Sequence, residues 1–484
     1  MDWNKLLCKD RIRSFQKSTI SRDLRTEFEK DYHRIIGSAS FRRLQDKTQV
    51  FPLDKSDYVR TRLTHSLEVS SFAKSLAQNV GEKIIRENKD INFTSKSKED
   101  ISNILQCAGL LHDIGNPPFG HFGETTIRDW FKNNLNKFYY KGTNLEEYLE
   151  PQMLEDFYNF EGNAQAFRLV TKLHFLVDEN GMNLTKALLG TIIKYPVSSL
   201  EINKKSGNIK TKKMGYFYAD RSNFKNVQES MNLYGNRHPL TYLLEAADDI
   251  AYKTADIEDS IEKGNLSYHQ LVKELEDRNL KHILNKNSIE KEFNNKTGQS
   301  QYEKLISILK HKYDKAIENG YQKPELYAVQ NWVVSIQGIL IFAASDNFIM
   351  NYDDIMKGTY KYDLFYDTDV KELMDDLGDI AYKYSFISKS IFKLEIAAQT
   401  IIEFLLNKFV EAVIYFDTEK KLSSIQERMI ALISKDYMRI YLKESENKSE
   451  KEKLYLRLML ITDYISGMTD SFAKDLYQEL NGII

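Results

Sequence analysis

Residues 110–124 concentrate reactive side chains in one short stretch, LLHDIGNPPFGHFGE. His112 and Asp113 end an apolar run, and His121 and Glu124 follow a turn rich in Gly and Pro. Imidazole and carboxylate groups bind divalent metal ions and transfer protons. A His–Asp pair alone is weak evidence, because helix ends and turns produce many such pairs. A metal site therefore needs ligands from elsewhere in the chain.

Two further segments supply such ligands. His65 begins an apolar helical pattern in TRLTHSLEV, and Asp248 and Asp249 stand side by side in the apolar segment EAADDIAY. A buried carboxylate is costly unless a cation or hydrogen bonds compensate it. With His112 and Asp113 these residues form a mixed nitrogen and oxygen ligand set, which suits Mn²⁺, Fe²⁺ or Ni²⁺, or Mg²⁺ with more retained water. Spacing alone does not choose between Asp248 and Asp249.

The second half of the opening stretch indicates proton transfer. Glu124 could hold the His121 imidazole in one tautomer and raise its pKa. The alternative is that His121 caps a turn and Glu124 only begins the next helix. Arg60 and Arg62 flank His65 and could meet phosphate oxygens. Arg42 and Arg43 are better explained as a surface pair, and the basic segment 204–213 as a solvated loop that could also contact a phosphate tail or single-stranded DNA.

The elements that must position these residues are mainly helical. Apolar residues recur at spacings of three and four in segments 69–80, 101–112, 240–251, 332–344 and 391–413. The best strand signal is segment 213–219, KMGYFYA, which could be a short strand or an extended loop. Only 7 Pro occur in 484 residues, which permits long helices. Candidate linkers are the polar segments 88–100, 202–213 and 444–453.

Composition limits the class of protein. The formal net charge is −2, so bulk binding to nucleic acid is not expected. Two cysteines, Cys8 and Cys107, fit a reducing compartment. The first residues carry no apolar leader, and Ile396 to Phe416, the most apolar late stretch, is interrupted by charged residues. We therefore expect a cytoplasmic protein without a membrane span.

The order His, His–Asp, Asp resembles that of the HD-domain phosphohydrolases, and longer segments are more specific. Six of them, in order, are similar to the bacterial deoxyguanosine triphosphate triphosphohydrolases, and they are residues 41–53, 60–69, 110–124, 160–168, 194–196 and 237–252. The resemblance is strong over about residues 20–260. It implies an all-α fold, with a catalytic core over residues 1–265 that includes an inserted loop at about 202–225. A helical region over residues 266–484 would complete the pocket and make oligomer contacts.

The resemblance also implies roles for individual residues. The expected metal ligands are His65, His112, Asp113 and Asp248, and the residues expected to act in catalysis are His121 and Glu124. The residues expected to bind substrate are Gln49, Arg62, Asn163, Lys194, Tyr195, Tyr252 and Asp256. In the family Tyr252 would stack on the deoxyribose and exclude a 2′-hydroxyl, while Gln49 and Asp256 would bind the 3′-hydroxyl. The metal would be Mn²⁺ or Mg²⁺ first, with Fe, Ni or Co as other choices.

The implied reaction is hydrolysis of a deoxynucleoside triphosphate, dGTP favoured, to the nucleoside and tripolyphosphate. The family also implies a homo-oligomer, commonly a hexamer, and leaves open a nucleotide activator or single-stranded DNA as an effector. Vertebrate relatives with a sterile-motif domain carry a Lys after the last metal Asp, where this chain has Asp249, so their control does not transfer. Base-reading residues are expected in the C-terminal half, where Glu395 and Gln399 are guesses.

Two other functions compete with this one. HD phosphohydrolases that act on cyclic dinucleotides, nucleoside monophosphates or alarmones lack the segments around residues 41–53 and 245–252. A non-catalytic regulator that binds nucleotide or single-stranded DNA would be expected to have lost a metal ligand, and none is missing here. Both alternatives are weaker than the triphosphohydrolase.

Overall fold

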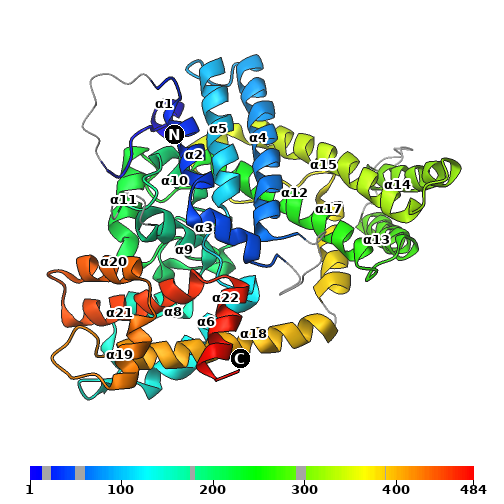
Figure 1. Ribbon diagram of the computed structural model, residues 1–484. Helices are drawn as coiled ribbons and strands as arrows, with labels where there is room; N and C mark the ends of the chain where they lie inside the picture. Colours follow the sequence, from blue (N-terminus) through cyan, green and yellow to red (C-terminus); the bar gives the residue numbers. More distant parts are fainter. Residues whose placement is uncertain (14–22, 50–59, 175–179, 290–300, 387–388, 484) are drawn as a thin grey trace.

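The computed structural model describes residues 1–484 except 14–22, 50–59, 175–179, 290–300, 387–388 and 484 (Figure 1). The prediction of a mainly helical protein is confirmed. In the described residues the sheet is one antiparallel hairpin, in which β1 (Tyr139–Tyr140) pairs with β2 (Thr143–Asn144).

The first half contains α1 (Trp3–Leu6), α2 (Glu27–Ile36), α3 (Ala39–Arg42), α4 (Arg62–Arg86), α5 (Ser95–Leu111), α6 (Gly120–Asn134), α7 (Leu145–Tyr148), α8 (Pro151–Tyr158), α9 (Gly162–Arg168), α10 (Lys186–Ile192), α11 (Arg221–Ser230) and α12 (Pro239–Glu262). The second half contains α13 (Tyr268–Ile289), α14 (Gln301–Glu318), α15 (Pro324–Met350), α16 (Tyr352–Lys357), α17 (Lys371–Ala381), α18 (Lys389–Val413), α19 (Ser424–Ala431), α20 (Lys435–Ser445), α21 (Glu450–Ser466) and α22 (Asp470–Leu480). Short 3₁₀ or π turns are η1 (Arg43–Asp46), η2 (Leu135–Lys137), η3 (Leu169–Leu173), η4 (Ser199–Glu201), η5 (Lys204–Ser206), η6 (Ile209–Thr211), η7 (Tyr218–Asp220) and η8 (Tyr382–Phe386).

The five segments with helical periodicity all lie in helices, namely α4, α5, α12, α15 and α18. Local signals fix where the site helices begin. Thr61 and Thr94 cap α4 and α5, each with a side-chain oxygen that accepts a backbone N–H of the first turn. Pro239 stands at the first turn of α12, where its missing N–H costs nothing.

Residues 213–219 were open to two interpretations, a short strand or an extended loop, and the structure has a loop as far as Phe217, with η7 beginning at Tyr218. The segment is extended, but Gly215 N–H to the Val197 carbonyl, at 3.0 Å, is the one backbone bond to a distant segment found for it in the described chain. A strand needs a ladder of such bonds. The predicted loop at about 202–225 holds short 3₁₀ turns and ends where α11 begins at Arg221.

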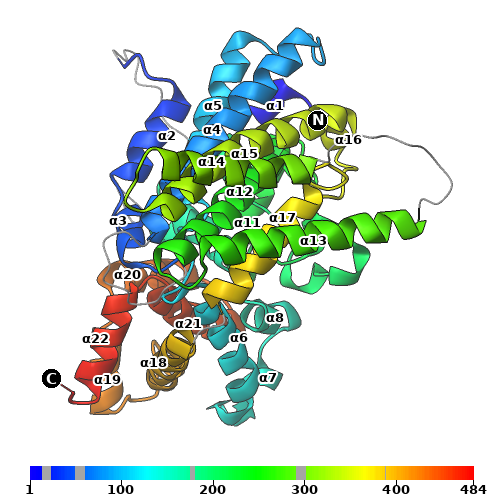
Figure 2. The same cartoon turned by 90° about the vertical axis from the view of Figure 1, so that its right-hand side faces the viewer.

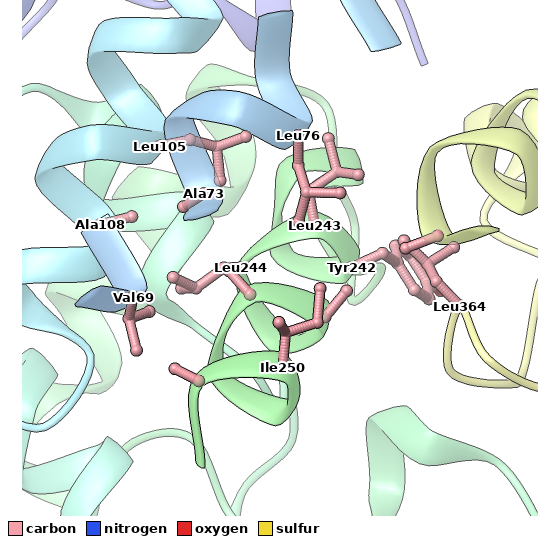
Figure 3. Close-up of a cluster of buried hydrophobic side chains, with 14 of the residues drawn as sticks. Val69, Ala73, Leu76, Leu105, Ala108, Tyr242, Leu243, Leu244, Ile250 and Leu364 are labelled. Carbon is pink, nitrogen blue, oxygen red and sulfur yellow. The ribbon is translucent and has the colours of Figure 1, made fainter. Parts of the chain in front are cut away.

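A first hydrophobic core surrounds α4, α5 and α12. Figure 3 shows side chains of α4 (Val69, Ala73, Leu76) and α5 (Leu105, Ala108) gathered against Leu243, Leu244 and Ile250 of α12. α15 packs on α4 and α12. The core extends to α17, so it contains residues from both sides of position 265.

A second hydrophobic core lies at the opposite end of the molecule, where α18 to α22 pack with α6 and α8 (Figures 1 and 2). It joins residues 119–164 to residues 398–476, again across position 265. The stretch 110–124 runs from one core to the other, because Leu110 belongs to the first and Phe119 to the second.

The most apolar long helix is α15 and not the predicted Ile396–Phe416 segment. By length and composition α15 could cross a membrane, and 44% of its most apolar window is buried inside the protein. Its buried residues, among them Trp332 and Phe348, belong to the first core. A core helix satisfies the same criteria, and α15 packs on α4, α12 and α14, although Val334, Phe342 and Met350 are exposed.

Candidate active site

A cavity of about 420 Å³ opens where α4, α12, the end of α5 and the start of α6 converge. Nine of the thirteen predicted site residues line it, and they are Gln49, Arg62, Asp113, His121, Asn163, Lys194, Tyr195, Asp248 and Tyr252. The other four are buried and each touches a lining residue; they are His65, His112, Glu124 and Asp256. The structure therefore brings all thirteen residues to one place.

The predicted metal ligands form the floor of this cavity. Ligand atoms of His65, His112 and Asp113 lie within 4.8 Å of one another. Asp248 Oδ1 lies 3.3 Å from His65 Nε2 and 3.4 Å from His112 Nε2. Asp248 thus stands beside the histidines, whereas Asp249 lines the cavity elsewhere.

Neighbouring groups hold these side chains in place. The carbonyl of Gly109 lies 2.8 Å from His112 Nδ1, which fixes the tautomer that leaves Nε2 free to bind a metal. Burial lowers the pKa of His112, so the imidazole is kept neutral. Asp113 accepts from Asn116 Nδ2 at 2.7 Å and from Arg62, and Asp248 accepts from Lys194 Nζ at 2.8 Å.

The residues present fit a divalent cation. His112 Nε2 faces Asp248, is buried and has no hydrogen-bond partner among the described residues. Buried polar atoms without partners are rare and costly, and a metal ion removes that cost for an imidazole nitrogen. The mixed set of two imidazoles and two carboxylates matches ions such as Mn²⁺.

His121 and Glu124 form a pair on the first turn of α6. Glu124 is buried, with Oε2 3.1 Å from His121 Nδ1 and Oε1 accepting the Gly162 N–H at 2.6 Å. The His121 side chain is 75% exposed and lines the cavity. The hydrogen bond to Glu124 raises the pKa of His121. Although burial works against it, the same bond lowers the pKa of Glu124.

Cations occupy part of the cavity wall. Arg62 and Lys194 stand beside the carboxylates of the floor, and Lys212 and Lys213 reach the wall from the loop before residue 214. Burial opposes the charge of Lys194, but the Asp248 and Glu245 carboxylates raise its pKa. Lys213 pairs with buried Glu161 at 2.8 Å. Such a wall suits a polyanion.

Tyr252 and Asp256 follow Asp248 at helical spacings of four along α12. Tyr252 and Tyr195 line the cavity, and Tyr252 hydrogen-bonds the carboxylate of Asp256, which lies behind it. Gln49 reaches the wall from the segment after η1, while residues 50–53 of the same motif lie outside the described residues.

Further residues from outside the predicted set reach the wall. Lys212 and Lys213 end the basic segment for which the sequence leaves open a solvated loop or contact with a phosphate tail, and both line the cavity, whereas Lys204 and Lys205 are exposed. The remaining wall residues outside the predicted set are Thr48, Asn116, Phe119, Phe122, Ile209, Glu245, Asp249, Asp363, Ile391 and Glu395. Of the two guesses for base reading, Glu395 lines the cavity, and Gln399 is exposed and bonds Glu403.

Arg60 does not join the cavity wall. It pairs with Glu68 at 2.9 Å, with Glu258 at 2.7 Å and with Asp259. These carboxylates raise the pKa of Arg60 against the effect of burial. Its charge therefore ties α4 to α12 and is not free for a phosphate. Arg42 and Arg43 are exposed, as the surface interpretation predicted.

Several known proteins are similar in sequence to this chain over its whole length or nearly so. The HD domain family matches residues 62–186. The deoxyguanosinetriphosphate triphosphohydrolase-like protein of Listeria monocytogenes is 49% identical over 100% of both chains. The protein of the same description from Synechocystis is 31% identical over 100% of both. The deoxyguanosinetriphosphate triphosphohydrolase of Klebsiella pneumoniae is 32% identical over 99% of this chain and 98% of its own.

Proposed function

The chain belongs to the deoxyguanosinetriphosphate triphosphohydrolase family of HD-domain hydrolases, and on that premise we propose that it hydrolyses deoxynucleoside triphosphates, dGTP foremost, to the deoxynucleoside and tripolyphosphate. The observation that supports this reaction is a single cavity that holds both a His–Asp metal cluster and the His121–Glu124 pair. Hydrolysis at the α-phosphorus needs a bound phosphate, a water and a proton for the leaving oxygen, and each has candidate residues here.

The floor would hold the metal and the phosphates. A divalent ion, Mn²⁺ or Mg²⁺, held by His65, His112, Asp113 and Asp248 would polarise a phosphoryl oxygen and lower the pKa of a bound water. Arg62 and Lys194 lie beside those ligands and would neutralise the α-phosphate, with Lys212 and Lys213 placed for the outer phosphates.

The water oxygen bonds to the α-phosphorus and gives up a proton, while the bond from that phosphorus to O5′ breaks. O5′ leaves with the electron pair and takes up a proton, which forms the 5′-hydroxyl. His121 is the group we assign to proton transfer, because it is exposed to the cavity and Glu124 keeps it protonated to higher pH. A positioned acid or base contributes about 10²–10⁴-fold. The geometry suits delivery to O5′ or withdrawal from the water.

The deoxyribose would lie against Tyr252, with the 3′-hydroxyl toward Gln49 and Asp256. Tyr195 and Asn163 would complete that wall. We further propose a cytoplasmic homo-oligomer, by the family resemblance and the reduced cysteines.

The test is to incubate the purified protein with each dNTP and with GTP, with Mn²⁺ or Mg²⁺ and again after chelation, and to identify the phosphate product. Deoxyguanosine with intact tripolyphosphate, lost on chelation, is the expected result. Orthophosphate or pyrophosphate would place the attack elsewhere and contradict the proposed chemistry. If single dNTPs give no product, mixtures of nucleotides distinguish an activator-dependent enzyme from a non-catalytic nucleotide-binding protein.

A further inference from the structure

The turn between α21 and α22, near the far end of the chain, bonds to two residues that line the active-site cavity. Asp470 is the first residue of α22 and is 1% exposed. Its Oδ1 accepts the Phe119 N–H at 2.8 Å, and its Oδ2 accepts the Thr48 N–H at 3.0 Å and the Thr48 hydroxyl. Phe119 and Thr48 both line the cavity, and they precede His121 by two residues and Gln49 by one.

Asp470 does not serve its own helix as a cap. The cap of α22 is Thr469, whose side chain accepts the Phe472 N–H at 3.3 Å. Both oxygens of the Asp470 carboxylate instead accept hydrogen bonds from backbone N–H groups 351 and 422 residues away in the chain. A buried carboxylate is costly, so one that accepts three hydrogen bonds from two cavity walls is a specific arrangement.

One of those walls is strained where Asp470 holds it. Phe119 has φ 62° and ψ 18°, in the left-handed region, and Gly120 follows with φ 60°. A non-glycine residue is strained in that conformation and persists in it only when its surroundings impose it. This double turn starts α6, lays Gly120 against the Arg62 guanidinium and presents His121 to the cavity.

Lys47 strengthens the same connection. Its buried Nζ donates to the Asn116 carbonyl at 2.5 Å and to the Ser466 carbonyl, at the end of α21, at 2.8 Å. The Arg62 N–H donates to the Lys47 carbonyl at 3.0 Å. The turn of residues 466–470 is thus tied to the strained loop and to the start of α4.

We propose that Asp470 is a positioning residue that sets the placement of His121 and of the Thr48–Gln49 wall. It acts through backbone and touches no substrate. The catalytic consequence rests on the proposed function, whereas the structural consequence does not.

The test compares Asp470→Ala and Asp470→Asn with Asp475→Asn, an exposed Asp on the same helix. Hydrogen–deuterium exchange is measured in peptides that contain Thr48 and Phe119, with α5 as the internal reference. Faster exchange in both peptides, but not in α5, is expected for Asp470→Ala, with a smaller change for Asp470→Asn, which keeps one acceptor oxygen. Unchanged exchange in either cavity peptide would overturn the proposal whatever the enzyme does.

The second readout is kinetic, with rates normalised to the sites that bind Mn²⁺ so that unfolded protein does not count. Because misplacement of a reacting group by about 1 Å can cost 10²-fold, kcat should fall by about 10- to 100-fold in Asp470→Ala, with a smaller loss in Asp470→Asn and little change in KM. A kcat equal to that of Asp475→Asn would refute positioning.

Wild-type protein that releases no tripolyphosphate refutes the proposed function and leaves the exchange result to decide the role of Asp470. If Asp470→Ala does not fold, Asp470→Asn carries both comparisons.

Discussion

His121 and Glu124 are the residues on which proton transfer in the cavity would depend. Their hydrogen bond raises the pKa of His121, so the protonated ring persists to higher pH than an ordinary histidine. Gln at position 124 would still accept the Gly162 N–H but would remove the negative charge. In Glu124→Gln we therefore expect the His121-dependent limb of the kcat–pH profile to move to lower pH, with kcat reduced by about 10²-fold.

The shift of the kcat–pH limb to lower pH is expected whether the His121 ring donates or accepts the proton. If His121 donates the proton, kcat falls as pH rises through its pKa, and the variant loses activity at lower pH. If His121 accepts the proton, the acidic limb of the kcat–pH profile moves to lower pH instead. Asp129→Asn, an exposed change on the same helix, should keep the wild-type profile. If the limb does not move in Glu124→Gln, the assignment of His121 to proton transfer is wrong.

Tyr252 allows a separate test of the sugar wall. Its ring lines the cavity and its hydroxyl bonds Asp256, so Tyr252→Ala opens space next to Asp248. We expect the ratio of kcat/KM for dGTP to that for GTP to fall about tenfold or more, within the range a pocket can impose on an added hydroxyl. Tyr252→Phe keeps the ring and should keep most of the preference. Equal ratios in wild type and Tyr252→Ala would refute the steric role.

At the scale of elements, the site depends on how closely α4 and α5 approach, because α4 carries His65 and His112 directly follows α5. A Cβ on Gly109 would lie 2.5 Å from Ser70 Cα and 2.6 Å from Ser70 N, both backbone atoms. The Gly109 carbonyl also orients His112. Gly109→Ala should cost about 1–3 kcal/mol of stability by overpacking and lower Mn²⁺ affinity about 10- to 100-fold, as loss of ligand orientation does.

Gly81 provides the matched control for that change. It lies at the other end of the same helix pair, and an added Cβ would meet the side chain of Lys98 at 2.6 Å. The contact is with Lys98 Cγ, near the backbone, so Gly81→Ala should also cost some stability. Because Gly81 lies 16 residues after His65 along α4, about 24 Å away, the change should leave Mn²⁺ affinity unchanged. Stability is measured by thermal unfolding and Mn²⁺ affinity by titration, for both variants. Equal Mn²⁺ affinities in the two variants would contradict the role of Gly109 in orienting His112.

At the scale of the whole molecule, the two cores explain which parts of the site could be predicted from sequence. His65 and Asp248 lie on helices, and His112 directly follows one. The periodicity of these helices can be recognised in the sequence, and each residue stands in a short local motif. No local sequence motif identifies Asp470, because its role depends on packing that brings together residues 351 positions apart. Asp363 and Glu395 likewise reach the cavity only because the C-terminal half folds back on the first. The sequence leaves residues 213–219 open between a strand and a loop for the same reason, since Phe217 and Tyr218 pack in the second core and the choice depends on distant partners.

Arg168 shows how the two ends of the molecule are joined. This buried residue of α9 bonds Asp463 of α21 with Nε and Nη2, at 2.8 to 3.0 Å, and also pairs with Asp220 at 3.2 Å and Glu444 at 3.1 Å. Arg168→Met leaves Asp463 buried without its cation, while Asp220 and Glu444 keep only Lys172. Breaking such a cluster costs about 3–5 kcal/mol, so the midpoint of thermal unfolding should fall clearly.

A double variant distinguishes an uncompensated charge from lost packing. Arg168→Met with Asp463→Leu replaces both partners by apolar side chains, and such replacements are often neutral. We expect it to recover much of the stability lost in Arg168→Met, with Asp220 and Glu444 still paired to Lys172 at one end of the cluster. A double variant no more stable than the single one would mean that Arg168 acts through its packing and not through its charge.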